Sequence, residues 1–233
     1  MTVRSLRRPV ALAGAVALLL GACSGGATSV PSHAPSPATG TAASTGTGTN
    51  GCPTSAPAPM TAADTATVTL ATAKGDIVIK VTGSLAPNAT GNFVALAACG
   101  FYDGVVFHRL VPGFVIQGGD GQYGRAPNLD AAQIGTGGPG YTIMDDPVTT
   151  PYKRGTVAMA RTPQPNSETS QFFIVLADGA APALASANTY AIMGEVTSGM
   201  DAVDAIGAMP NSGGPNNTAL DPLPITKATV TRP

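Results

Sequence analysis

The chain of 233 residues has no tryptophan, three cysteines and two histidines, and charged residues make up only 11% of it. His108 is the one histidine that lies in a region with the composition of a folded domain, and no cysteine is near it in sequence. A catalytic Cys–His pair or a zinc site needs more such groups, so the sequence disfavours both. The glycine-rich run Gly135–Gly140 lacks the Lys-Ser/Thr of a phosphate-binding P-loop.

Basic residues are also scarce. Three of the 12 Lys and Arg residues are Arg4, Arg7 and Arg8, so nine remain to oppose 13 Asp and Glu, which gives the rest of the chain a net charge of −4. A partner with many phosphates needs a basic patch or stripe on the protein. Nothing in this charge balance favours nucleic acid as a partner.

The N-terminal apolar run is too short to span a membrane. Val10–Leu20 follows the three arginines, and a membrane span needs about 20 residues. This pattern is typical of a secretory signal. The run ends in Leu20-Gly21-Ala22-Cys23, which resembles the bacterial lipobox. We therefore expect a signal peptide over residues 1–22 and a lipid anchor on Cys23, at the outer face of the cell membrane. The alternative is cleavage near Ala22 and a secreted protein.

A low-complexity segment, residues 23–64, separates this signal from the rest. It is rich in Ser, Thr, Pro, Gly and Ala, and Ser24 to Ala63 contains no charged residue. Such a segment buries too little apolar surface to fold, so we expect a disordered tether. Cys52 lies in the tether and Cys99 at the end of a predicted helix. After export they could form a disulfide or stay free, and the sequence favours neither.

Residues 65–233 suffice for one domain with its own core. Alternating or β-branched runs predict a hairpin, and apolar residues at helical spacing predict two helices. The expected strands are 67–72, 77–81, 155–160, 170–176, 190–196 and 225–230, and the expected helices are 89–98 and 198–208. Many short strands with glycine-rich turns favour a closed β-barrel over a parallel sheet.

The most informative segment is Phe107–Asp120, with the sequence FHRLVPGFVIQGGD. Arg109, Val111, Val115 and Gln117 share a parity, so strands would send them to one side. One guanidinium among apolar side chains predicts a pocket that holds an apolar group and polarises it.

Together with other segments, this one resembles the cyclophilin family of peptidyl-prolyl isomerases. The matching segments stand in family order: 92–96, 101–104, 107–120, 135–138, 155–160, 165–167, 170–175 and 192–196. The resemblance implies a closed eight-stranded antiparallel β-barrel capped by two α-helices, and catalysed rotation about X–Pro bonds without a metal or other cofactor. It implies Pro-containing peptides or unfolded exported proteins as partners, and we expect a monomer.

The resemblance also assigns residue roles. It implies that Arg109 is the catalytic arginine. The implied substrate-binding residues line a proline pocket (Phe114, Val115, Phe173, Leu184), its rim (Tyr190) and an adjoining groove (Gln117, Ala160, Arg161, Gln171). Val115 and Arg161 stand where family members usually have Met and Asn, and we expect Arg161 to add charge to the groove. An alternative function is a low-activity module that only binds Pro-containing peptides. A purely structural envelope lipoprotein would give no reason for Arg109.

Overall fold

The computed structural model describes residues 51–233. The predicted signal peptide, Cys23 and most of the predicted tether lie outside the described residues. None of the helices within 51–233 has the length and apolar character needed to cross a bilayer.

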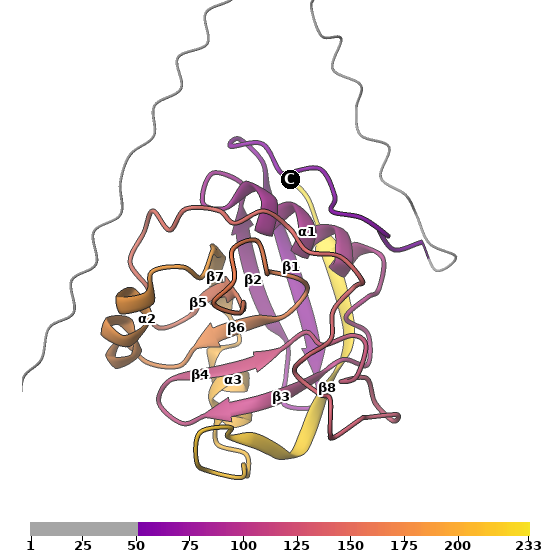
Figure 1. Ribbon diagram of the computed structural model, residues 1–233, viewed down its shortest axis with the longest axis vertical. Coiled ribbons are helices and arrows are strands. Elements are labelled where there is room, and N and C mark those ends of the chain that lie inside the picture. Colours follow the sequence, from indigo (N-terminus) through magenta and orange to yellow (C-terminus); the bar gives the residue numbers. More distant parts are fainter. Residues whose placement is uncertain (1–50) are drawn as a thin grey trace, which may run out of the picture. The chain divides into compact units, whose positions relative to one another are not determined.

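Eight strands form a closed barrel, as the sequence predicts (Figure 1). Every strand pair is antiparallel, and the order around the barrel is β1-β2-β7-β5-β6-β4-β3-β8. The strands are β1 (Thr65–Thr72), β2 (Ile77–Thr82), β3 (Val106–Val111), β4 (Val115–Gly118), β5 (Thr156–Met159), β6 (Phe172–Val175), β7 (Ile192–Ser198) and β8 (Thr218–Thr231). The helices are α1 (Pro87–Ala98), α2 (Ala181–Ala187) and α3 (Met200–Gly207), and a 3₁₀ turn, η1 (Asp178–Ala180), precedes α2.

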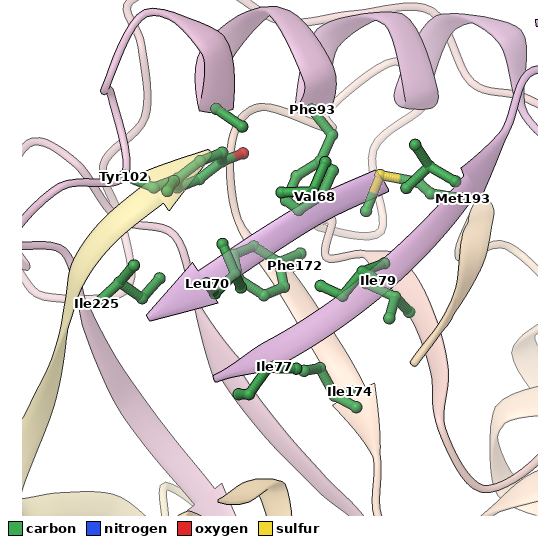
Figure 2. Close-up of a cluster of buried hydrophobic side chains, with 14 of the residues drawn as sticks. Val68, Leu70, Ile77, Ile79, Phe93, Tyr102, Phe172, Ile174, Met193 and Ile225 are labelled. Carbon is green, nitrogen blue, oxygen red and sulfur yellow. The ribbon is translucent and has the colours of Figure 1, made fainter. Parts of the chain in front are cut away.

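Alternating side chains of the strands fill the barrel. Val68 and Leu70 of β1 point inward beside Ile79 of β2, and all three are fully buried. Figure 2 shows these side chains together with Phe93 and Phe172, whose rings meet edge to face with centroids 5.2 Å apart. Because one face of each strand is buried in this way, the hydrophobic pattern fixes the register of the sheet.

Helices α1 and α3 cover opposite ends of the barrel (Figure 1). Helix α1 starts at Pro87 and has no side-chain cap of its own at Ala86. Instead, Asp146 from a distant loop accepts hydrogen bonds from the Ala89 backbone N–H at 2.8 Å and the Asn88 side-chain amide at 2.9 Å. A carboxylate at this position satisfies a free helical N–H and complements the helix dipole.

Helix α2 is a third helix that the sequence did not predict. Its residues, APALASA, include no charge, and Leu184 is the only one that is buried. A seven-residue segment with one apolar anchor has too little periodicity to indicate a helix. Its position matters because it forms one wall of the cavity described below.

The long loop after β4 is organised by the buried carboxylate of Asp120. One oxygen accepts the N–H groups of Gln122 and Tyr123 at 3.0 and 2.9 Å, and the other accepts those of Gly135 and Gly137 at 2.7 and 3.0 Å. The glycine-rich run therefore already binds an internal anion. The preceding Gly119 has φ +98°, and a Cβ there would lie 2.5 Å from the Ser170 carbonyl oxygen, so this turn requires glycine.

The end of the predicted tether lies against the domain. Cys52 and Cys99 form a disulfide, which answers the question that the sequence left open. The Met60 N–H donates to the Pro87 carbonyl at 3.0 Å. A Cβ on Gly91 of α1 would lie 2.5 Å from the Ala58 carbonyl oxygen. The chain before β1 thus follows the surface of α1 at close range.

The disulfide is expected to contribute substantially to stability. It joins residues 47 apart in sequence, and closing a loop of this size should stabilise the folded state by about 2–4 kcal/mol through the entropy of the unfolded chain. Replacing both cysteines with serine should lower the free energy of unfolding by that amount in urea titrations. Wild-type protein kept reduced should behave like the double variant. Equal urea midpoints for the oxidised wild type and the double variant would contradict this expectation.

Candidate active site

The β3–β4 hairpin places Arg109 and Gln117 side by side. Arg109 pairs with Gln117 in the register, and Val111 pairs with Val115. The four residues therefore share one side of the hairpin, as their parity predicts. Nη1 of Arg109 approaches Oε1 of Gln117 at 3.4 Å, which orients the guanidinium along this side.

Strand β6 adds an aromatic wall. It pairs with β4 so that Phe173 lies opposite Gln117. The Phe173 ring meets the ring of Tyr190 edge to face, with centroids 5.4 Å apart and an interplanar angle of 87°. Leu184 of α2 is buried in the same apolar cluster, which also includes Val115. The side of the hairpin that carries Arg109 thus faces a hollow with both apolar and polar walls.

A cavity of about 300 Å³ lies between these elements. Every residue predicted for the site lines it except Gln171, and Ala183 and Ala187 of α2 contribute as well. The predicted lining residues are Arg109, Phe114, Val115, Gln117, Ala160, Arg161, Phe173, Leu184 and Tyr190. Sequence reasoning missed the two alanines because α2 was not predicted and a methyl side chain carries no chemical signal.

Gln171 lies behind the cavity wall rather than on it. Its amide nitrogen donates to the carbonyls of Gly135 and Gly137, both at 2.9 Å, and its oxygen accepts from the Gln117 amide at 3.1 Å. Because Gln117 contacts Arg109 in turn, Gln171 orients the guanidinium indirectly, through Gln117. It links the glycine-rich loop to the cavity.

Arg109 has no acidic partner in the part of the chain that the structure describes. None of the ion pairs found there includes Arg109. Asp120, the nearest acid in its motif, instead accepts four backbone N–H groups. The guanidinium is therefore not paired with an acid there and lies beside the apolar side chains of Phe114, Val115 and Phe173, where a hydrogen bond to a ligand is stronger than in water.

Arg161, by contrast, has partners for its charge. Its Nη1 pairs with Oδ2 of Asp145 at 2.8 Å, and its Nη2 donates to the Gln164 carbonyl at 2.8 Å. Its side chain is only 8% exposed. The expectation that Arg161 adds charge to the groove is therefore not met, because Asp145 neutralises it locally. Sequence alone could not pair two residues on separate loops.

His108 does not line this cavity. It precedes Arg109 on β3 and is buried, and its Nδ1 has no hydrogen-bond partner among residues 51–233. Burial is the main cause that lowers the pKa of His108 to about 4. The imidazole is therefore neutral near pH 7, which fits a structural group better than a proton carrier.

Comparisons with known proteins agree on one family. A family model described as "Cyclophilin type peptidyl-prolyl cis-trans isomerase/CLD" matches residues 67–230. The chain is 42% identical over 166 residues to the "Probable peptidyl-prolyl cis-trans isomerase" of Brucella abortus (strain 2308), which covers 70% of this chain and 82% of the relative. It is 36% identical over 179 residues to peptidyl-prolyl cis-trans isomerase A of Dickeya dadantii (strain 3937), covering 75% and 90%.

Solved structures give the same result. A crystal structure of a cyclophilin type peptidyl-prolyl cis-trans isomerase of Cryptosporidium parvum aligns with a TM-score of 0.60 at 28% identity, over 72% of this chain and 98% of that one. A second structure of that protein, in the presence of the dipeptide Ala-Pro, aligns with a TM-score of 0.60 at 29% identity, over 71% and 98%.

The buried histidine predicts a loss of stability in acid. The pKa of His108 is about 4 in the folded state against 6.5 in a model peptide, so the unfolded state binds a proton more readily between these values. The free energy of unfolding should therefore fall as pH drops from about 6.5 to 4, by on the order of 2 kcal/mol. Urea unfolding of wild type and His108→Gln at pH 7 and 4.5 measures this effect. Wild type should lose more stability than the variant, and equal losses in both would refute it.

Proposed function

The chain belongs to the cyclophilin-type peptidyl-prolyl cis-trans isomerase family and has its isomerase activity, and from this premise we propose that Arg109 stabilises the twisted X–Pro bond in the cavity of β3, β4, β6 and α2. The observation that carries the proposal is an arginine with no acidic partner in the described chain, beside apolar walls. A charged donor next to a hydrophobic hollow is suited to a ligand that is apolar around one polar atom.

The chemistry of the X–Pro bond explains why such a donor is sufficient. Resonance in the planar amide opposes rotation with a barrier of roughly 18–20 kcal/mol. When the bond twists, resonance is lost and the prolyl nitrogen gains a free lone pair. A guanidinium stays protonated at every physiological pH and can donate to that lone pair. Because this hydrogen bond forms only in the twisted state, it lowers the barrier rather than merely binding the substrate.

The surrounding residues have complementary tasks. Phe114, Phe173 and Leu184 contact the proline ring, which stays fixed while the chain before it rotates. Gln117 holds Arg109 in place and is itself held by Gln171. Low local polarity strengthens the Arg109 hydrogen bond at the moment when the nitrogen becomes an acceptor.

The proposal extends to where the enzyme works. We infer that the chain is exported, that Cys23 carries the lipid anchor, and that the clients are unfolded exported or envelope proteins. The Cys52–Cys99 disulfide supports export, since disulfides persist in oxidising compartments and are rare in the cytosol. Two or more acyl chains would hold the protein at the membrane, where one would not.

A second candidate function is binding without efficient turnover. It is favoured by Val115, a smaller wall than the Met usual in the family. A smaller side chain would grip the proline ring less closely and place its nitrogen less accurately relative to Arg109.

Exchange rates on an Ala-Pro peptide test the role of Arg109. Removing the proposed donor to the prolyl nitrogen should lower kcat/KM on the order of 10²-fold in Arg109→Ala. The measurement is cis–trans exchange of the peptide by NMR. Arg154→Ala is the control, because it also removes an arginine, and Arg154 pairs with Asp204 and does not line the cavity.

The control should retain wild-type exchange. Equal exchange rates for wild type and Arg109→Ala would refute the role of Arg109. Peptide binding by the wild type without acceleration of exchange would favour the binding module.

The anchor is tested separately from the activity. Cys23→Ser should release the protein from the membrane fraction into the medium, because the thioether can form only on the cysteine sulfur. Mass spectrometry of the mature wild-type N-terminus should show a lipid-modified Cys23. An unmodified N-terminus on a membrane-free wild-type protein would refute the anchor and leave the isomerase proposal intact.

A further inference from the structure

Glu168 is a buried acid that the proposed mechanism does not use. It lies just before β6, in an isolated antiparallel bridge with Ile143, and its side chain is fully buried. Oε1 accepts the backbone N–H of Ala191 at 3.3 Å. Oε2 is buried and has no hydrogen-bond partner within residues 51–233. An unpaired carboxylate in this position would be strongly unfavourable.

The groups around Glu168 do not compensate its charge. Asp145 and Asp146 on the loop that pairs with it are both acidic, and Tyr152 adds no cation. Among the described residues, Arg161 is the cation that acts on it, but its guanidinium is paired with Asp145 and donates to backbone carbonyls. Burial is the main cause of the raised pKa of Glu168, which is about 8. The charges of the two aspartates also contribute to the rise.

The contact of Glu168 leads directly to the rim of the proline cavity. Ala191, which it holds, follows Tyr190, whose ring packs on Phe173 in the cavity wall. The backbone of Tyr190 is also fixed by Tyr152, whose hydroxyl donates to its carbonyl at 3.0 Å and accepts its N–H at 3.2 Å. The rim therefore depends on two buried side chains. Glu168 is the one that changes charge first as pH rises, because burial raises the pKa of the Tyr152 phenol further above its ordinary value.

We propose that Glu168 is a positioning residue that, as a neutral acid, holds the Tyr190 rim of the proline cavity, so that its ionisation loosens the rim. This role rests on the proposed function for its effect on catalysis. An ionised Glu168 is repelled by Asp145 and Asp146 and must gain water at Oε2. Water can reach a fully buried oxygen only if a neighbouring segment moves, and the segment at Ala191, which is bonded to the other oxygen of the same carboxyl group, borders the rim. A displaced rim leaves the proline ring less well held.

The pH dependence of catalysis tests the proposal. In wild type, kcat/KM for an Ala-Pro peptide should fall roughly tenfold between pH 6.5 and 9.5, mostly through KM, because the rim binds substrate rather than reacting with it. Glu168→Gln, which resembles the neutral acid but cannot ionise, should match wild type at pH 6.5 and show no fall. The measurement is the rate of cis–trans exchange of the peptide at each pH, followed by NMR on carbon-bound protons that do not exchange with water.

The matched control is Glu195→Gln. Glu195 is an exposed glutamate on β7 that pairs with Lys153, so this variant should keep the wild-type profile. A flat wild-type profile, or an equal fall in Glu168→Gln, would overturn the proposal. Absence of exchange in wild type at pH 6.5 would instead refute the proposed function.

A measurement that does not depend on catalysis tests the positioning role even if wild type shows no exchange at pH 6.5. The ring resonances of Tyr190 should shift with an inflection near the pKa of Glu168, about 8, in wild type and in Glu195→Gln. They should not shift in this way in Glu168→Gln. Tyr190 resonances that are unaffected by pH in wild type would overturn the positioning role whatever the enzyme's activity.

Discussion

The carboxylate of Asp120 is the interaction on which the site depends. By accepting four backbone N–H groups, it ties the end of β4 to the glycine-rich loop. The carbonyls of that loop then hold Gln171, which holds Gln117, which contacts Arg109. Each step in this chain is a hydrogen bond between buried or half-buried groups, where an unmade partner is costly. A single buried acid is therefore linked by hydrogen bonds to the Arg109 guanidinium without forming an ion pair with it.

The two arginines at the cavity, Arg109 and Arg161, have identical side chains but different hydrogen-bond and ion-pair partners. Arg161 pairs with Asp145 and donates to several backbone carbonyls, and it thereby links separate loops. Within residues 51–233, Arg109 donates to one amide oxygen, that of Gln117. Charge pairing thus distinguishes an arginine that is held by an acid from one that is not, where residue type alone cannot. The same principle applies to the acids, since Asp120 is satisfied by N–H groups while Glu168 lacks a partner for one oxygen.

Strand periodicity made much of this fold predictable. The parity of Arg109, Val111, Val115 and Gln117 and the order of the short strands both reflect burial of one strand face, which is local in sequence. What could not be predicted depends on contacts between distant loops. Helix α2 has no apolar stripe, and Asp145 could not be paired with Arg161. No pattern marks Glu168 as buried, because a lone glutamate normally indicates an exposed position.

The Cys52–Cys99 link also determines how the domain would bear load. A pull transmitted along the chain from before Cys52 would pass through the sulfur atoms to Cys99, just after α1. The covalent loop between them would carry almost none of that force. Strands β1 and β2 and helix α1 all lie within this loop, so traction could not peel the first strand from the barrel. Tension would first be felt at the turn that leads into β3, and the oxidised protein should resist mechanical unfolding from its N-terminal side far better than the reduced one.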